Sequence, residues 1–171
     1  YGLQVGSGGP LRVAHVLPAI GGSVQRTFGR PIVVTASEPA GARLMPEHDS
    51  IPIALVLNEL LTNAIKHGSG EQVRCDAALA DDGICIAIAN RGRLPDGFSL
   101  QQYPGALSGL GLVRALLPRR SSTLAIEQHG DEVVASIRLR PPSVVEPPLA
   151  ALTVAATEGA EPARERSRAA A

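Results

Sequence analysis

The segment from Ile53 to Gly68 constrains the fold and the chemistry of this chain more than any other. It reads Ile-Ala-Leu-Val-Leu-Asn-Glu-Leu-Leu-Thr-Asn-Ala-Ile-Lys-His-Gly and is largely apolar apart from one set of polar residues. At about 3.6 residues per turn, the spacing of this set places it on one face of a helix of about four turns. We call the set the polar stripe; its members are Asn58, Glu59, Thr62, Asn63 and Lys66. The segment therefore predicts a helix that packs on a core and presents one polar face.

The polar stripe differs from an ordinary solvent-facing surface, which usually carries several charges at i,i+4 spacing. It contains two amides, a hydroxyl, one acid and one lysine. Such a set can ligate a hard metal ion, place a base and meet a phosphate. A plain structural explanation stays open, in which a partly buried helix has an outer face that happens to be polar.

The composition is that of one globular domain without a charge-driven partner. The chain has 171 residues, enough to bury a core, and a formal net charge of zero. A nucleic-acid partner is not expected, because the charges balance and only two Tyr, two Phe and no Trp are available for stacking. No apolar run reaches the length of a membrane span, so no membrane contact by this segment is expected. The start at Tyr1 is compatible with a piece cut from a longer protein.

The two cysteines lie in a predicted hairpin that turns at residues 81–83. Pairing about that turn places Cys75 near Ile88 and Cys85 near Ala78, so the two thiols would not face each other. A disulfide is therefore not expected. Free cysteines in the core are typical of a protein in a reducing, cytoplasmic compartment.

Helices are predicted where apolar residues recur every three or four positions, and strands where they alternate between turn signals. Ser50 is expected to cap the central helix, Pro52 to lie in its first turn, and Gly68 and Gly70 to end it. The predicted order is helix 11–28, strand 31–36, loop 37–49, helix 53–67, strands 72–79 and 84–90, loop 91–105, a short helix ending near residue 118, and strands 122–128 and 132–140.

This order predicts an α+β fold in two layers, a mixed and mostly antiparallel sheet with helices packed on one face. The central helix would lie on the sheet with its polar stripe turned toward the rim. Residues 1–10 are expected to be a linker or a cut end, and residues 11–140 to form one domain. Residues 141–171, rich in Pro, Ala, Glu and Arg, are expected to be a disordered tail.

Three separated elements are predicted to form one site. The polar stripe is the first, and Asn90-Arg91-Gly92 is the second, where an amide at a strand end can read the edge of a flat ligand. The third runs from Ser108 to Leu112, where two glycines let the backbone approach a phosphate before a helix begins. Each glycine motif also has an ordinary explanation as a turn. Their order and separation favour a shared ligand.

At these motifs the chain resembles the ATP-binding domain shared by gyrase, the ninety-kilodalton heat-shock chaperone, histidine kinases and MutL, the GHKL superfamily. Asn-Glu-Leu-Leu-Thr-Asn-Ala-Ile-Lys-His-Gly (58–68) resembles the N box of bacterial sensor histidine kinases, in the form seen in the HWE group. Asn90-Arg-Gly92 resembles the first glycine box, and Gly109-Leu-Gly-Leu112 resembles the second. The resemblance covers roughly residues 11–140 and implies the histidine-kinase-type ATPase fold.

The resemblance also implies a role for each matched residue. Asn63 matches the asparagine whose side-chain oxygen ligates Mg²⁺ between the phosphates of ATP, and Glu59 matches a position for a base or for a group that positions the transfer. Lys66 matches a phosphate-contacting residue. His67 matches a position that lines the nucleotide pocket, although the end of a helix also favours a histidine. The other matched positions would contact the nucleotide: Asn90, Gly92, Ser108, Gly109, Leu110, Gly111 and Leu112.

The chain departs from the family pattern at positions that bear on nucleotide affinity. Asn90 stands where the family has an aspartate that accepts a hydrogen bond from the adenine amino group, which an amide oxygen can also do. Arg93-Leu-Pro95 follows Gly92, so the second glycine of that box is missing. Leu107 stands where a glycine usually precedes Gly109, and the lid between the two boxes is short.

The resemblance implies an ATP- and Mg²⁺-binding kinase domain that transfers the γ-phosphoryl group to a histidine. That histidine would belong to a separate or upstream dimerisation module, with a response regulator as the next partner. The surroundings of His15 do not match the acceptor motif, and His48 and His129 fall in loop or turn positions. Two alternatives stay open. One is a serine kinase of the anti-sigma-factor type, and the other is a degenerate GHKL domain that acts as a protein-interaction module.

Overall fold

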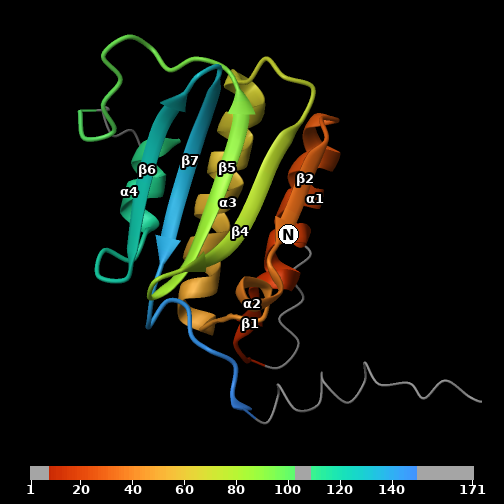
Figure 1. The fold of residues 1–171 in the computed structure, drawn as a ribbon, viewed down its shortest axis with the longest axis vertical. Coiled ribbons are helices and arrows are strands. Elements are labelled where there is room, and N and C mark those ends of the chain that lie inside the picture. The colour runs from red at the N-terminus through yellow and green to blue at the C-terminus, as the bar shows by residue number, and fades with distance from the viewer. Residues whose placement is uncertain (1–7, 103–108, 150–171) are drawn as a thin grey trace, which may run out of the picture.

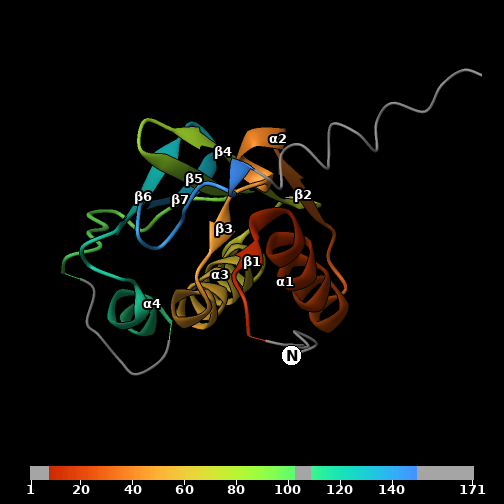
Figure 2. The same cartoon turned by 90° about the horizontal axis from the view of Figure 1, so that it is seen from below.

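The computed structural model describes residues 8–102 and 109–149, in which helices and strands follow an order close to the predicted one. The elements are β1 (Leu11–Arg12), α1 (Val13–Phe28), β2 (Ile32–Ala36), α2 (Glu38–Gly41), β3 (Leu44–Met45), α3 (Glu47–His67), β4 (Val73–Ala80), β5 (Gly83–Arg91), α4 (Leu110–Leu116), β6 (Ser122–His129) and β7 (Glu132–Leu139). Figure 1 shows the sheet, and Figure 2 shows α1, α3 and α4 together on one of its faces. None of the helices in this part of the chain is long and apolar enough to cross a membrane.

The main sheet contains five strands in the order β2-β4-β5-β7-β6. β2 runs parallel to β4, and every other pair of neighbours is antiparallel. β1 and β3 form a separate two-stranded antiparallel sheet. This topology confirms the predicted α+β sandwich with a mixed, mostly antiparallel sheet.

Aliphatic side chains from the two layers meet in one core. Along β5 the alternate residues Ile84, Ile86 and Ile88 are at most 1% exposed, as the two-residue period of a strand requires. Leu57 and Leu61 lie one turn apart on α3 and are buried to the same extent. Removing one such side chain from water contributes roughly 1.5–3 kcal/mol. This shared core holds α3 in a fixed position relative to the central strands.

The register of the β4–β5 hairpin is the one that the sequence predicts. Cys75 pairs with Ile88, and Ala78 pairs with Cys85. Cys75 faces the core and is 1% exposed, whereas Cys85 lies on the opposite face of the sheet and is half-buried. Both thiols are free, which confirms that the hairpin does not carry a disulfide.

We expect the buried thiol of Cys75 to make the stability of the domain depend on pH in the alkaline range. Burial, with a smaller contribution from the charge of Asp76, raises the pKa of Cys75 from 9.0 to about 12. The folded state therefore holds a proton that the unfolded state releases, so this stabilisation is complete below the unfolded pKa and falls as pH rises toward the folded pKa. The expected loss is about 1.4 kcal/mol per pH unit between the two values.

Urea unfolding of the wild type and of Cys75→Ala, at about pH 9 and about pH 11, measures this effect. The difference in unfolding free energy between the wild type and Cys75→Ala should decrease by about 2 kcal/mol over that interval. Cys85→Ala serves as the control and should keep the pH slope of the wild type. A gap for Cys75→Ala that stays constant with pH would show that the thiol does not contribute in this way.

The α3 helix begins earlier than predicted, at Glu47 instead of near Ile53. Its N-cap is Pro46, and Ser50, the predicted cap, lies inside the helix, where its Oγ donates to the carbonyl of Glu47. Glu47 and Asp49 place two acidic residues in the first turn, and negative charge there stabilises a helix start. Ser50 is only 5% exposed, so tertiary packing carries the helix past the local cap signal.

The predicted domain end at residue 140 falls too early. Ser143 and Val144 are fully buried, and the Oγ of Ser143 donates to Asp49 Oδ2 at 2.9 Å. Val145 pairs with Leu44 of β3 through two backbone hydrogen bonds of 2.9 and 2.8 Å. The start of the predicted tail thus packs on α3 and on β3, an element that the sequence hides within the predicted loop 37–49. Residues 1–7 of the predicted linker and residues 150–171 of the predicted tail lie outside the described residues.

Candidate functional site

A pocket of about 300 Å³ lies between α3, the central strands, the segment after β5 and the start of α4. Its walls bring together residues far apart in the sequence, five of which the sequence predicts as site residues. Within residues 8–102 and 109–149, the pocket is lined by Leu60, Asn63, Ala64, His67, Ile88, Asn90, Arg93, Leu94, Pro95, Phe98, Gly109, Leu110, Ile126, Val133 and Ala135.

The face of α3 that lines the pocket is rotated relative to the polar stripe. It contributes Asn63 and His67 together with the apolar Leu60 and Ala64, at the spacing of one helix face. Of the polar stripe, only Asn63 reaches the pocket wall. The polar pattern in the sequence therefore does not coincide with the face of α3 that lines the pocket, because that face contains both polar and apolar residues.

Two other residues that the sequence places in the site do not line the pocket. Glu59 is half-buried, and Lys66 is exposed on the last turn of α3. Neither has an ion pair or a side-chain hydrogen bond in the part of the chain that the structure describes. Both side chains therefore stay available, and their catalytic roles remain predictions.

Asn90 lies at the end of β5 with its amide held in one orientation. The residue is 7% exposed, and its Nδ2 donates to the carbonyl of Arg91 at 3.1 Å. Turning the amide over would set its oxygen against that carbonyl, which is unfavourable. The amide oxygen is consequently the atom left to accept a hydrogen bond from a ligand in the pocket.

Two glycines let the end of α3 approach Asn90 closely. A Cβ on Gly68 would lie 2.4 Å from the carbonyl oxygen of Ala64 and 2.9 Å from Nδ2 of Asn90. A Cβ on Gly92 would lie 3.2 Å from the same Nδ2 and 3.3 Å from the carbonyl oxygen of His67. Gly68 is extended (φ −83°, ψ 146°), so it ends the helix as predicted but is needed for space, not for a left-handed turn. Gly92 thus packs closely against the side chain of Asn90 but does not line the pocket.

Arg30 is a structural residue of this region that no sequence motif indicates. Its Nη1 donates to the carbonyls of Ile65 and Gly68 at 2.7 and 3.0 Å, and its Nη2 donates to the carbonyl of Gly70. A cation is favoured at a helix C-terminus, where carbonyls have no helical partner. Arg30 therefore fixes the turn that carries Gly68 against Asn90. Arg30 and Ile65 are 35 residues apart in the sequence, so no local sequence pattern predicts their contact.

The second glycine box enters the pocket through Gly109 and Leu110. Gly109 has φ 67° and ψ −137°, a backbone conformation that favours glycine, and its Cβ position is open. It precedes α4, a helix of seven residues that packs against α3. Gly111 and Leu112 lie in the first turn of α4 and do not line the pocket. Ser108 lies outside the described residues.

The remaining walls are mostly apolar, and the lining residues include an arginine but no acid. Ile88, Ile126 and Val133 come from three adjacent strands, and β6 and β7 carry no polar motif that could have indicated their part in the site. None of the lining residues named above is acidic, whereas Arg93 is a cation without an ion pair in the described part of the chain. The pocket thus combines apolar walls with one arginine among its lining residues, which suits a flat ligand that carries negative charge.

The described residues contain no cluster of three or more His, Cys, Asp or Glu side chains that could hold a metal ion by themselves. Mg²⁺ does not depend on such a cluster, because it is commonly held by one or two protein oxygens together with substrate phosphates and water. The side-chain oxygen of Asn63, on the pocket wall, is a ligand of that type.

Comparison with known proteins identifies the kind of domain to which this pocket belongs. The sequence model of the histidine kinase-like ATPase domain matches residues 30–137. No curated protein sequence matches the chain.

Among solved structures, the blue-light activated histidine kinase of Erythrobacter litoralis matches with a TM-score of 0.60 and 20% identity, over 75% of this chain. The ATP binding domain of PrrB from Mycobacterium tuberculosis matches with a TM-score of 0.62 and 22% identity, over 79% of this chain and 98% of that domain. At identities this low, the TM-scores show a shared fold and nothing further. The chain spans 42% of the Erythrobacter kinase and 65% of its histidine kinase domain.

Proposed function

This chain belongs to the family of histidine kinase-like ATPase domains, and from that premise we propose that it is the catalytic domain of a two-component sensor histidine kinase. It would bind ATP with Mg²⁺ and transfer the γ-phosphoryl group to a histidine on a separate or upstream dimerisation module. A cytoplasmic response regulator would be the next partner. One observation carries the proposal: Asn63, His67, Asn90, Gly109 and Leu110, from α3, β5 and the start of α4, line one pocket.

The base of ATP fits the inner part of this pocket. The apolar side chains of Ile88, Ile126 and Val133 can enclose a flat ring. Asn90, held by the Arg91 carbonyl, presents an oxygen that can accept a hydrogen bond from the amino group of adenine. An amide keeps the direction of the hydrogen bond that the family's aspartate makes but lacks its charge, so the expected affinity is lower.

The phosphates fit the outer part. Arg93 and His67 are exposed lining residues whose side chains could contact phosphates, and the backbone at Gly109 has no side chain to keep a phosphate away. Asn63 would hold Mg²⁺ through its side-chain oxygen. When bound, Mg²⁺ neutralises phosphate charge during the transfer.

Glu59 and Lys66 would act from the same helix. Glu59 lies one turn before Asn63, and Lys66 lies almost one turn after it. We propose that Glu59 positions the transfer and that Lys66 contacts a phosphate once the nucleotide is bound. Catalytic side chains are often displaced until the ligand is present, so their place outside the pocket wall is compatible with these roles.

Isothermal titration calorimetry with a non-hydrolysable ATP analogue tests nucleotide binding directly. We expect saturable heat in Mg²⁺ and weaker binding in excess EDTA. A second candidate function, a degenerate domain that binds another protein, is favoured by Asn90 and by Leu94 in place of the family's aspartate and second glycine. Absence of heat at nucleotide concentrations of about 1 mM would support that candidate and contradict the kinase.

The nature of the acceptor needs a separate experiment with the full-length protein. After incubation with radiolabelled ATP, label on histidine is lost in acid, whereas label on serine is retained. Acid-labile incorporation is the expected result. Acid-stable label would instead support the serine kinase of the anti-sigma-factor type.

A further inference from the structure

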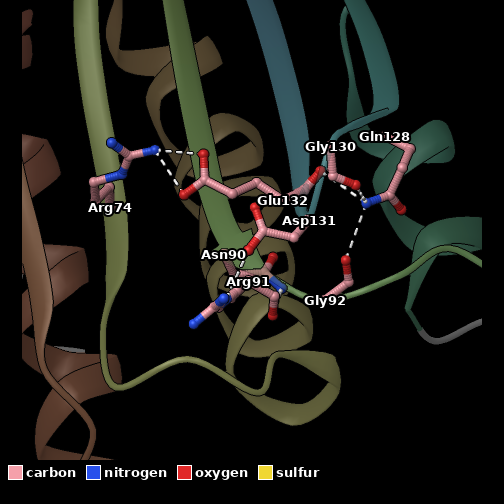
Figure 3. A network of polar contacts seen from close by, with 8 residues as sticks. All are labelled: Arg74, Asn90, Arg91, Gly92, Gln128, Gly130, Asp131 and Glu132. Carbon is pink, nitrogen blue, oxygen red and sulfur yellow. Dashed lines mark hydrogen bonds and ion pairs between the residues drawn. The ribbon is translucent and has the colours of Figure 1, made fainter.

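The side chain of Gln128, near the end of β6, joins the β6–β7 turn to the segment that follows β5 (Figure 3). Its Nε2 donates to the carbonyls of Gly92 and Gly130 at 3.0 Å each and to the carbonyl of Glu132 at 3.1 Å. Its Oε1 accepts from the backbone N–H of Leu94 at 2.8 Å. One amide side chain thus contacts four backbone groups.

These contacts continue the sheet beyond its last strand pair. The β5–β7 ladder ends at Arg91 and Glu132. The N–H of Gly92 then donates to the carbonyl of Asp131 at 2.9 Å, and Gln128 supplies the acceptor and donor that a neighbouring strand would otherwise provide. Backbone groups that are paired in this way keep a defined path. The segment from Gly92 to Leu94 is therefore fixed to the β6–β7 turn.

The fixed segment forms a wall of the pocket. Leu94 lines it beside Arg93 and Pro95. Directly before Gly92, the carbonyl of Arg91 accepts a hydrogen bond from Nδ2 of Asn90 at 3.1 Å and so orients the amide that would face the base. A shift of this backbone would move the apolar wall and the oriented amide together.

We propose that Gln128 is a positioning residue that fixes the base side of the nucleotide pocket through Gly92 and Leu94. The inference rests on the proposed function, because it assigns Gln128 to the same pocket. Leu94 stands where the family has its second glycine. In this chain, the hydrogen bonds of Gln128 hold the backbone at that position. Gln128 would not touch the nucleotide.

Gln128→Glu is the sharpest test because it keeps the size of the side chain and replaces Nε2 by an oxygen. That oxygen would face three carbonyl oxygens, whereas the contact with the Leu94 N–H can persist. Gln72→Glu is the matched control, since Gln72 is exposed, has no side-chain hydrogen bond in the described part of the chain and does not line this pocket. Both variants add one negative charge near the same end of the sheet.

Calorimetry should use both ADP and a non-hydrolysable ATP analogue. Gln128→Glu is expected to weaken both by about tenfold, with their ratio unchanged, and to reduce the preference for ADP over GDP. Gln72→Glu should change each affinity by less than about twofold. A purely structural role in the β6–β7 turn would lower the unfolding midpoint without changing the preference between bases.

Two results would overturn the inference while leaving the proposed function intact. In one, folded Gln128→Glu binds both nucleotides as the wild type does. In the other, it loses only the ATP analogue, which would place its effect at the phosphates. A wild type that binds neither nucleotide would overturn the proposed function and this inference with it.

Hydrogen exchange gives a readout that does not need nucleotide. Gln128→Met keeps the length of the side chain but removes all four hydrogen bonds, and it is the variant to use if Gln128→Glu does not fold. The amide of Leu94 should then exchange faster, while the amides within β5 keep their protection. Unchanged exchange at Leu94 would contradict the clamp.

Discussion

Replacing Asn63 by alanine is expected to weaken the binding of a non-hydrolysable ATP analogue in Mg²⁺ by about a hundredfold, equivalent to about 2.7 kcal/mol. Asn63 lies on the α3 wall of the pocket, and the proposal makes its side-chain oxygen the protein ligand of the metal. Among the described residues, no acidic side chain lines the pocket to replace it. Hard oxygen ligands are the ones that Mg²⁺ requires. Calorimetry in Mg²⁺ and in EDTA should therefore show a loss that is confined to the metal-dependent part of the affinity.

Asn58→Ala is the control for that experiment. Asn58 belongs to the same polar stripe and is also half-buried, but it does not line the pocket. Its replacement should leave nucleotide affinity within about twofold of the wild type. If Asn63→Ala bound the analogue as tightly as Asn58→Ala in Mg²⁺, Asn63 would not be the metal ligand.

Gly83→Ala is expected to destabilise the whole domain by at least about 3 kcal/mol. Gly83 begins β5, which lies between β4 and β7 in the sheet. A Cβ at this position would lie 1.9 Å from the carbonyl oxygen of Leu139 and 2.9 Å from the Cα of Arg140. Both atoms belong to the backbone, so a flexible side chain cannot relieve the clash. Urea denaturation followed by circular dichroism measures the loss.

The same substitution at the other hairpin separates this steric effect from the general cost of replacing a glycine. Gly130 has φ 62°, and no atom lies within 4 Å of its Cβ position. Gly130→Ala should therefore cost only the backbone strain of a left-handed conformation, about 1 kcal/mol. Gly83→Ala costing no more than Gly130→Ala would mean that the strand ends can move apart freely, contrary to the packing seen here.

Features encoded by nearby residues were predictable from the sequence. The alternation on both sides of the turn at residues 81–83 gave the correct pairing of Cys75 with Ile88 and of Cys85 with Ala78. The apolar period of the central helix gave its packing face. The three motifs gave a family, and the match over residues 30–137 confirms it. Five of the residues that these motifs named line one pocket.

The membership of the pocket wall was less predictable, because side chains from distant segments decide it. Ile126 and Val133 face the pocket because β6 and β7 pair beside β5, and their sequences show only ordinary strand alternation. Arg30 and Gln128 act on backbone 35 and 34 residues away, respectively, through hydrogen bonds that leave no periodic pattern. At Ser50 the local sequence was misleading. A good cap signal predicted the start of the helix there, but Ser50 is buried inside α3, which begins at Glu47.

By itself, the sequence determined the period of each main element, the register of the central hairpin and the set of polar and glycine motifs that identify the family. These properties depend on residues within a few positions of one another, where helix and strand geometry leave few choices. Tertiary structure alone decided that Asn63 lines the pocket while Glu59 and Lys66 do not. It also decided that Asn90 is held by the Arg91 carbonyl and that residues 143–145 belong to the folded domain. Those outcomes follow from how rigid elements rotate and pack against each other, and packing is settled by contacts between segments far apart in the chain.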